Sequence, residues 1–254
     1  MTDRQTDRQT DRQTDRQLLV LLIKILCFFL VLPKWRKKAE VKLLSYLKHN
    51  EFILVKEDGT IIKNPKIKGL KVSFRGENSK IEIHAPYNFR KCNITLGDNA
   101  CVKIGKTKYK IDKLSISQMN NNSVEIGENF STFYCRMLMQ DEKHTFIKIG
   151  DDCMFSTGIV ILPSDGHTLY DKNTGEILNK PVGITIHDHV WVGRDVYILK
   201  NTEIPSNCVV GSRSLVTKKF TEEYTAIAGS PAKVIKHNIN WDRENTDNFV
   251  SKTK

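Results

Sequence analysis

The sequence predicts an all-β protein that folds as a parallel β-helix, and the main evidence is a repeat of six residues. Large aliphatic residues recur at this spacing over residues 186–216, namely Ile186, Val192, Ile198, Ile204, Val210 and Val216. Four positions after each of the first five stands a mostly small residue, namely Val190, Val196, Thr202, Cys208 and Ser214. An apolar face repeats every three or four residues in a helix and every two in a strand. A period of six is typical of a β-helix, whose short strands each point one aliphatic side chain to the centre and whose corners need small residues.

Similar units occur upstream at looser spacing, as Phe74-Arg-Gly-Glu-Asn, Leu96-Gly-Asp-Asn, Ile126-Gly-Glu-Asn and Ile149-Gly-Asp-Asp. Gly, Asn and Asp tolerate the left-handed backbone that tight corners demand. Alternating segments at 80–83, 102–104 and 114–116 indicate short strands between these corners. Because the register slips between units, we expect loops to leave the coil at 127–148 and 163–183.

These patterns divide the chain into five segments. We expect a disordered repeat at 1–17, an apolar segment at 18–33, a helical cap region at 34–64, the β-helix at 65–236 and a short tail at 237–254. The cap is predicted from the helical spacing of Val41, Leu44 and Leu47 within 36–48. Stacked coils bury one another's faces, so a chain with only 39% hydrophobic residues can still form a core.

Residues 2–17 are four copies of Thr-Asp-Arg-Gln. A wholly polar, net neutral repeat predicts disorder. The same four residues can be encoded by the tetranucleotide ACAG three times over, so the gain or loss of one unit shifts the downstream reading frame. We hypothesise that the tract is a replication-slippage switch for phase-variable expression. Mixed synonymous codons in the gene would contradict this hypothesis.

Residues 18–32 are apolar apart from Lys24, and a basic cluster follows at 34–38. These fifteen residues fall short of the roughly 20 that a spanning helix needs. The features of a signal peptide, a basic n-region and a small-residue cleavage site, are not seen. Two interpretations stay open: peripheral membrane contact through 18–38, or packing against the coil or a partner subunit. The expected location is the cytoplasm, either free or at the inner face of the membrane.

Composition limits the partners. The net charge is +11, and residues 56–113 hold 14 Lys and Arg against six acidic residues. Such a basic surface either attracts anionic lipid, polysaccharide or nucleic acid or is simply solvated. Nucleic acid is not expected, because no recognised binding module accompanies the charge. The cysteines form no CxxC pair and predict apolar fillers in a reducing compartment, with neither disulfides nor a metal site; they are Cys27, Cys92, Cys101, Cys135, Cys153 and Cys208.

His167 is the candidate for acid–base chemistry. It lies in Pro163-Ser-Asp-Gly-His-Thr-Leu-Tyr-Asp, directly after the strand-like segment 159–162. A histidine on a loop that projects from a rigid scaffold suits general-base work, although a lone loop histidine is more often only solvated. Asp165 or a backbone carbonyl is the expected partner of its second ring nitrogen.

Three other histidines are weaker candidates. His187 and His189 flank Asp188, and strand alternation would point both of them toward the rim of one cleft. A metal site there would need a third ligand, which the sequence does not supply. His144 is expected on the surface.

The segment from Ile149 to Trp241 strongly resembles the hexapeptide-repeat O-acetyltransferases that modify surface polysaccharides, a type that includes sialic-acid and polysialic-acid acetyltransferases. The matching stretches are SDGHTLYD with a TG…N loop behind it, IHDHVWVGRDVYILKNTEIP, VVGSRSLVTK, AGSPAKVIK and NINWDR. Five motifs in this order over more than ninety residues make the match specific. The N-terminal third matches only in general character.

The resemblance implies a left-handed β-helix, a homotrimer, and acetyl-CoA bound in clefts between neighbouring subunits. It implies that His167 is the catalytic histidine and that Trp191 lines the active site. For the coenzyme it indicates Gly211, Ser212, Lys218 and the run Gly229-Ser230-Pro231-Ala232-Lys233. One departure is Arg213, where the family usually carries a small residue.

Elementary chemistry is consistent with these roles. Acyl transfer from a thioester needs a base for the acceptor hydroxyl, donors for the developing oxyanion and cations for the nucleotide phosphates. His167 suits the first role, and Lys218 and Lys233 suit the last. Trp191 either stacks on a sugar or the pantetheine arm or only covers a corner of the coil. Direct attack is expected, because no serine or cysteine has a recognisable nucleophile setting.

The sequence thus favours an acetyl-CoA-dependent O-acetyltransferase acting on a surface sugar of the capsular or lipo-oligosaccharide kind, such as sialic acid. One alternative is an N-acetyltransferase for an amino-sugar nucleotide, since the same scaffold serves both acceptors. The other is a non-catalytic β-helix binding module. Retention of AGSPAKVIK with both of its lysines favours coenzyme A binding over that module.

Overall fold

The computed structural model describes residues 19–23, 48–118, 120–140 and 144–250. The chain divides into two compact units, residues 1–50 and residues 51–254. In the first unit, residues 19–23 form a helical turn. No helix among the described residues is long and apolar enough to cross a membrane. The polar repeat predicted at 1–17, most of the apolar segment at 18–33 and the cap helix predicted within 36–48 lie outside the described residues.

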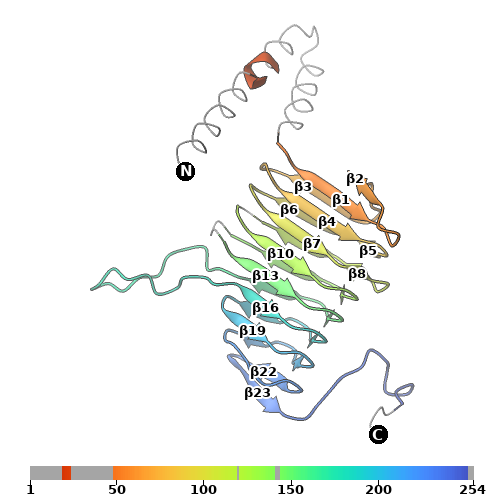
Figure 1. The fold of residues 1–254 in the computed structure, drawn as a ribbon. Coiled ribbons are helices and arrows are strands. Elements are labelled where there is room, and N and C mark those ends of the chain that lie inside the picture. The colour runs from red at the N-terminus through yellow and green to blue at the C-terminus, as the bar shows by residue number, and fades with distance from the viewer. Residues whose placement is uncertain (1–18, 24–47, 119, 141–143, 251–254) are drawn as a thin grey trace, which may run out of the picture. The chain divides into compact units, whose positions relative to one another are not determined.

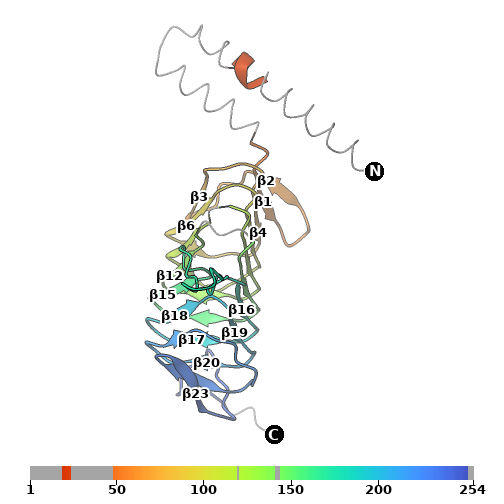
Figure 2. The same ribbon diagram turned by 90° about the vertical axis from the view of Figure 1, so that its left-hand side faces the viewer.

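The second unit is a parallel β-helix of three sheets (Figures 1 and 2). Sheet A contains β1 (Glu51–Val55), β2 (Ile61–Lys63), β4 (Lys80–His84), β7 (Cys101–Ile104), β10 (Ser123–Ile126), β13 (Phe146–Ile149), β16 (Ile184–Ile186) and β19 (Thr202–Ile204). Sheet C contains β5 (Phe89–Arg90), β8 (Ile111–Asp112), β11 (Ser131–Thr132), β14 (Met154–Phe155), β17 (Trp191–Val192), β20 (Val209–Val210), β22 (Ala226–Gly229) and β23 (Ala232–Lys236). Sheet B contains β3 (Leu70–Phe74), β6 (Cys92–Leu96), β9 (Leu114–Ser117), β12 (Cys135–Leu138), β15 (Ile159–Leu162), β18 (Tyr197–Leu199) and β21 (Leu215–Val216).

From β4 to β21, each coil runs through sheets A, C and B in that order, so the coil has an A–C, a C–B and a B–A corner. Successive coils pair in parallel. Two antiparallel pairs, β1 with β2 and β22 with β23, stand at the ends of the stack.

The six-residue repeat is confirmed as the inward face of the coil. Residues eighteen apart in the repeat are direct partners: Ile186 pairs with Ile204, Val192 with Val210 and Ile198 with Val216. All six side chains are fully buried. Each step of six residues therefore moves the chain to the next sheet, and three steps return it to the first sheet in the next coil.

The corners between the sheets account for the polar residues of the repeat. Left-handed backbone recurs every six residues, at His189, Asp195, Asn201, Asn207 and Arg213. Upstream, Gly150 is needed for a different reason: a Cβ there would lie 2.1 Å from the carboxylate of Asp188 in the next coil. That carboxylate accepts a hydrogen bond from the backbone N–H of Asp151 at 2.8 Å. Glycine lets the coils approach closely enough for the aspartate to satisfy the corner.

Two boundaries differ from the expectation. The parallel sheet starts at β1, ahead of residue 65, because Ile53 and Leu54 already pair with the strand Lys80–His84 and are buried. The predicted excursion at 127–148 is wrong, since β11 and β12 lie within it and continue the stack. The excursion at 163–183 is confirmed, since no strand lies between β15 and β16.

The described cysteines are unpaired thiols, and all but one of them are buried. Burial raises the pKa of the Cys153 thiol to about 12 and also raises that of Cys135. These thiols therefore stay protonated at neutral pH and act as small apolar residues of the core. Cys101 is exposed, unlike Cys92, Cys135, Cys153 and Cys208.

Candidate active site

Residues 163–183 form an arm that leaves the β-helix between β15 and β16 (Figure 1). Its two sides are joined by an antiparallel bridge between Tyr170 and Ile177, and the N–H of Leu178 donates to the carbonyl of Leu169 at 2.8 Å. At the tip, the carboxylate of Asp171 accepts two backbone N–H bonds, from Asn173 and Thr174. The arm is thus an ordered hairpin.

His167 lies near the root of this arm and is exposed. Asn179, on the returning side, holds the backbone around it. The Asn179 amide donates to the carbonyl of His167 at 2.8 Å, and its oxygen accepts the N–H of Leu169 at 2.8 Å. Gly166, just before His167, has a left-handed φ of 74° that disfavours any side chain. The backbone on both sides of His167 is therefore fixed.

Asp165 has a different role from the one expected. Its carboxylate accepts hydrogen bonds from the Lys200 ammonium and from the Asn179 amide. The Lys200 ammonium, followed by the Asn179 amide, lowers the pKa of this carboxyl group. Asp165 thus ties the root of the arm to the coil above and stays ionised. Among the described residues, no hydrogen bond to the His167 ring is present.

Lys218 lies at the same B–A corner as the arm. Because Ile198 pairs with Val216, Lys200 and Lys218 occupy equivalent positions two residues further along adjacent coils. Lys218 is exposed, with its Nζ 5.3 Å from the ring centroid of Phe220. At this corner, successive coils toward the C-terminus therefore carry the arm with His167, then Lys200 and then Lys218.

The other predicted coenzyme residues gather at the C–B corner. Gly211 and Ser212 follow β20, and Gly229 and Ser230 end β22 and begin the turn into β23. Ser214 joins the two coils: its hydroxyl donates to the carbonyl of Gly211 at 2.6 Å and accepts the N–H of Gly229 at 3.2 Å. These predicted residues are at least partly accessible.

Lys233 and Arg213 lie close to this group. Lys233 pairs with Ala228 across the antiparallel ladder and is exposed. Arg213, the departure from the family pattern, occupies the left-handed position of its corner with a φ of 58° and is also exposed.

Trp191 lies on the outer side of sheet C and is 39% exposed. Its ring centroid is 6.2 Å from that of Trp241, which is buried and stacked on the His189 ring at 4.2 Å. The indole N–H of Trp241 donates to the carbonyl of His189 at 2.8 Å. Trp191 is thus neighboured by a residue fifty positions away in the sequence.

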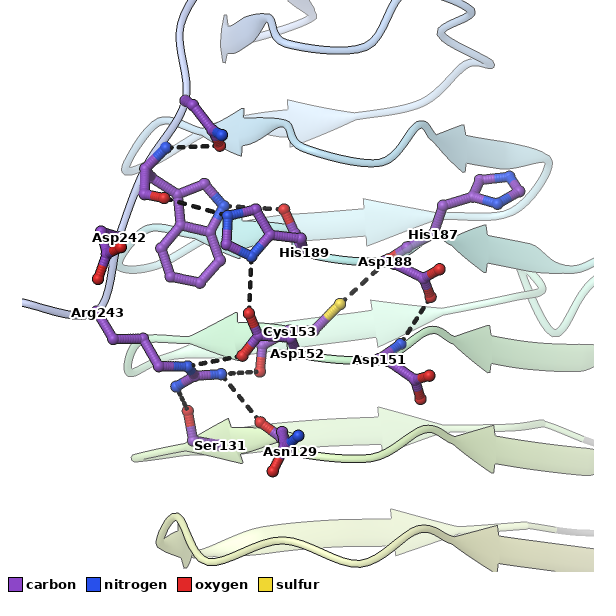
Figure 3. Close-up of polar contacts among 12 residues, drawn as sticks. Asn129, Ser131, Asp151, Asp152, Cys153, His187, Asp188, His189, Asp242 and Arg243 are labelled. Atoms are coloured by element: carbon purple, nitrogen blue, oxygen red, sulfur yellow. Dashed lines mark hydrogen bonds and ion pairs between the residues drawn. The ribbon is translucent and has the colours of Figure 1, made fainter. Parts of the chain in front are cut away.

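Trp241 belongs to a C-terminal strap, residues 239–243, that returns to the middle of the β-helix (Figure 3). The guanidinium of Arg243 donates to the Asp152 carboxylate at 2.9 Å, to the Ser131 hydroxyl at 2.8 Å and to the Asn129 carbonyl at 2.9 Å. It also lies 4.1 Å from the ring centroid of Tyr109. One side chain therefore connects several coils.

The prediction that His187 and His189 line one cleft is wrong. His189 has a left-handed φ of 54°, which breaks the strand alternation. Its ring lies between the Asp152 carboxylate at 2.7 Å and the carbonyl of Trp241 at 3.1 Å. His187 points to the other side, as Figure 3 shows, and bonds to Glu203 at 3.1 Å. His189 is thus a structural partner of the strap.

The predicted residues therefore occupy three places on the chain: His167 and Lys218 at the B–A corner, Trp191 on sheet C, and Gly211, Ser212, Gly229, Ser230 and Lys233 near the C–B corner. Within the described part of the chain, no group of three or more His, Cys, Asp or Glu residues is arranged to hold a metal ion. Asn179, Lys200, Trp241 and Arg243 were not predicted individually, although Trp241 and Arg243 lie in the NINWDR motif.

Known proteins resemble the chain in both sequence and structure. A polysialic acid O-acetyltransferase of Neisseria meningitidis is 47% identical over 98 residues, which are 39% of this chain and 46% of that protein. One of Escherichia coli O1:K1 is 35% identical over 108 residues, which are 42% of this chain and 35% of that protein. The matched region thus spans less than half the length of these relatives. No family model matches the sequence.

The crystal structure of the polySia-specific acetyltransferase NeuO superimposes with a TM-score of 0.68 at 30% identity, over 79% of this chain and 88% of that chain. The chain belongs to the hexapeptide-repeat acetyltransferase family. This likeness confirms the left-handed β-helix. The match to NeuO covers most of this chain, so it includes coils whose inward residues are spaced by more than six positions.

Proposed function

We propose that the protein transfers an acetyl group from acetyl-CoA to a hydroxyl of an acidic surface polysaccharide of the sialic acid class. The observation that carries this proposal is the ordered arm, which presents an exposed His167 on a backbone held by Asn179. Lys218 is exposed at the same corner, where its cation is available to a coenzyme phosphate. The sialic acid class of acceptor is proposed because the relatives described above are polysialic acid O-acetyltransferases.

The reaction requires one base and no covalent intermediate. His167 accepts the proton of the acceptor hydroxyl while the oxygen attacks the thioester carbon. The C–S bond then breaks, and the protonated His167 returns the proton to the leaving thiolate, which gives the acetyl ester and free coenzyme A. Cys135 and Cys153, whose thiols stay protonated because burial raises their pKa, lie in the core and take no part. Lys218 and Lys233 bind phosphate groups of the coenzyme.

The complete site forms between copies of the chain in a homotrimer. Sheet B separates the corner of His167 and Lys218 from the corner of Gly211 and Ser212 in a single chain. The arm also exposes five large apolar side chains, from 44% to 60% each: Leu169, Tyr170, Ile177, Leu178 and Val182. An ordered hairpin with so much apolar surface is suited to a partner. A neighbouring copy supplies that partner and brings the two corners together.

The assembly is tested with the variants Leu169→Asp and Leu178→Asp. Each buried leucine contributes about 1.5–3 kcal/mol to an interface, so the double variant should run as a monomer in light scattering and lose activity together with assembly. Lys172→Asp, on the exposed tip of the arm, is the control that should remain trimeric. A wild-type protein that is already monomeric at micromolar concentration would contradict the intersubunit site.

The reaction is tested by thiol release from acetyl-CoA. Free sialic acid, polysialic acid and a UDP-amino sugar serve as acceptors, and the product is checked for a base-labile ester. Release with the sialic acceptors and an ester product are expected. Preference for the amino sugar and an amide product would instead show N-acetylation. Release with none of them would contradict the proposal.

The base is tested with His167→Ala. Loss of a positioned base costs about 10²–10⁴ in rate, while assembly and acetyl-CoA binding should persist because the exposed His167 side chain is not among the five apolar side chains proposed for the interface. His144→Ala, an exposed histidine elsewhere, is the control and should retain wild-type turnover. A His167→Ala variant that keeps most of its turnover would show that another group is the base.

A further inference from the structure

A groove on the C–B corner, outside the residues assigned above, has the features of a ligand site. It encloses about 450 Å³ and is lined by Arg90, Asp112, Lys113, Phe133, Thr157 and Arg194, among others. These residues end sheet C strands or follow them at the corner in successive coils, from β5 to β17. The parallel stacking therefore places side chains as far apart in sequence as Arg90 and Arg194 along one edge.

Asp112 is the buried polar group of this groove. Its side chain is about 2% exposed, and one carboxylate oxygen, Oδ2, accepts a hydrogen bond from the Arg90 guanidinium. The second oxygen, Oδ1, is buried and has no partner in the described structure. Leaving a buried carboxylate oxygen without a hydrogen-bond donor is unfavourable. Oδ1 is closed to solvent in this conformation, so a ligand donor reaches it only when a neighbouring side chain shifts, and the Arg90 side chain, which is 53% exposed, is placed to do so.

The bonding partner for Asp112 Oδ1 must be a donor. The Arg90 guanidinium lowers the pKa of Asp112, so the carboxyl group is ionised at neutral pH and only accepts hydrogen bonds. A hydroxyl or an amide N–H of a ligand meets this requirement, whereas a bare phosphate does not.

The rim of the groove carries the opposite charge and an aromatic ring. Lys113 and Arg194 are exposed, and within the part of the chain that the structure describes neither side chain forms an ion pair. Phe133 is 62% exposed. Cations bind a carboxylate, and an aromatic face packs on the apolar C–H face of a sugar ring. Together with the acceptor of Asp112, these groups complement a ring with a carboxylate and hydroxyl or acetamido donors.

We propose that this groove binds an acidic sugar residue of the polymeric acceptor, away from the residue that is acetylated. The inference rests on the proposed function, because it extends the acceptor beyond the reacting centre. The groove adjoins the candidate coenzyme corner: the N–H of Arg194 donates to the Ser212 hydroxyl at 3.1 Å. A polysaccharide bound along this edge therefore extends to the coil that contains Ser212.

The test uses the variants Lys113→Gln and Phe133→Ala in the full chain, with Lys103→Gln on sheet A as a matched control. For a long polysialic acceptor, the KM should rise about tenfold in the combined variant, as expected for the loss of one charge-assisted contact and one stacking contact. The KM for acetyl-CoA, the turnover number and the KM for free sialic acid should stay unchanged. An unchanged KM for the long acceptor would overturn the proposal. A raised KM for acetyl-CoA would instead make the groove a coenzyme subsite.

Direct binding separates this proposal from the proposed reaction. Calorimetry without acetyl-CoA should show binding of polysialic acid, little binding of neutral dextran, and weaker binding to the combined variant. Binding should weaken at high salt, because the rim charges are exposed. Equal binding of both polymers, or equal binding by the variant, would overturn the groove assignment. A protein that binds polysialic acid here but transfers no acetyl group would contradict only the reaction.

Discussion

At the scale of single residues, the corners of the β-helix are positions where an unfavourable left-handed backbone conformation is tolerated. Five corner residues at 189, 195, 201, 207 and 213 share positive φ values, and three of them are Asn or Asp. Asn and Asp adopt this conformation with little penalty, whereas other side chains pay about 1–2 kcal/mol. His189 is compensated by its bonds to Asp152 and Trp241. Arg213 has no comparable side-chain compensation within the described residues.

Replacing Arg213 by Asn should therefore stabilise the protein. The expected gain is about 1 kcal/mol in the free energy of unfolding, because the corner keeps its φ of 58° and Asn, whose short polar side chain bonds locally, adopts this backbone at lower cost than Arg. Thermal unfolding should shift upward by roughly 2–4 °C. The control is Arg136→Asn on β12, where extended backbone gives Asn no advantage. A lower midpoint for the Arg213 variant would mean that its side chain makes a favourable contact elsewhere, as in an assembled trimer.

Lys218 and Lys233 are expected to bind the coenzyme phosphates and to leave the chemical step alone. Alanine at either position should raise the KM for acetyl-CoA much more than it lowers turnover, because a contact far from the thioester stabilises ground and transition states alike. Initial-rate kinetics at varied acetyl-CoA concentration measures both. Lys180→Ala, an exposed lysine on the returning side of the arm, is the control. The coenzyme assignment fails if acetyl-CoA dependence is unchanged in both variants.

At the scale of elements, the arm depends on Asn179 more than on any packed core. Asn179→Ala removes three hydrogen bonds at the root of the arm, to Asp165, His167 and Leu169. Misplacement of a catalytic group by about 1 Å costs on the order of 10² in rate. Turnover should fall by about that factor, while the KM for acetyl-CoA stays close to wild type.

Asn173→Ala is the matched control for this prediction. Asn173 lies on the same arm and its backbone N–H donates to Asp171, but its side chain forms no hydrogen bond to the residues that the structure describes. Hydrogen exchange in the arm should accelerate in the Asn179 variant and not in the control. Turnover that falls equally in both variants would show that Asn179 has no special positioning role.

The regular elements were predictable from sequence where the repeat is strict. From Ile186 to Val216 each corner has the same length, so the period of six locates every inward residue. Upstream, coils are longer than eighteen residues: the Ile126 level is reached again at Ile149. Extra corner residues there shift the pattern without breaking the stack, which is why 127–148 was wrongly assigned to an excursion. The start at Glu51 was missed for the same reason.

The candidate site was only partly predictable. His167 was found because a titratable residue follows a strand at the start of a polar loop. Local patterns give no information on partners that lie far apart in sequence, such as Trp241 with His189 or Arg243 with Ser131. They also misplaced His189, because strand alternation does not hold through a left-handed corner. The Asn in the TG…N loop was visible, but its three bonds to the arm were not.

At the scale of the whole β-helix, stability comes from contacts between neighbouring coils, and the strap adds one long-range connection. Arg243→Ala removes its bonds to Asp152, Ser131, Asn129 and Cys153. The free energy of unfolding should fall by about 2 kcal/mol, as for the loss of charged hydrogen bonds at a partly buried site. Chemical denaturation measures the fall, and Lys236→Ala at the exposed end of β23 is the control.

The same variant should loosen Trp241 and the surroundings of Trp191. Fluorescence should shift to longer wavelength as the buried Trp241 becomes accessible to water. Unchanged stability and fluorescence would show that the strap detaches readily even in the wild-type protein.

The bond between Asp152 and Arg243 joins residues 91 positions apart, so it closes a loop that contains the C-terminal coils, from β14 to β23. A stack of coils without such a link would peel from its last strand, one coil at a time, when its C-terminus is pulled. Here tension on the end of the chain is transmitted through Arg243 to the coils of Asn129, Ser131 and Asp152, so β16 to β23 carry no load until the strap breaks. An optical-tweezers trace should accordingly begin with one high-force rupture instead of a staircase of small ones, and Arg243→Ala should restore the staircase.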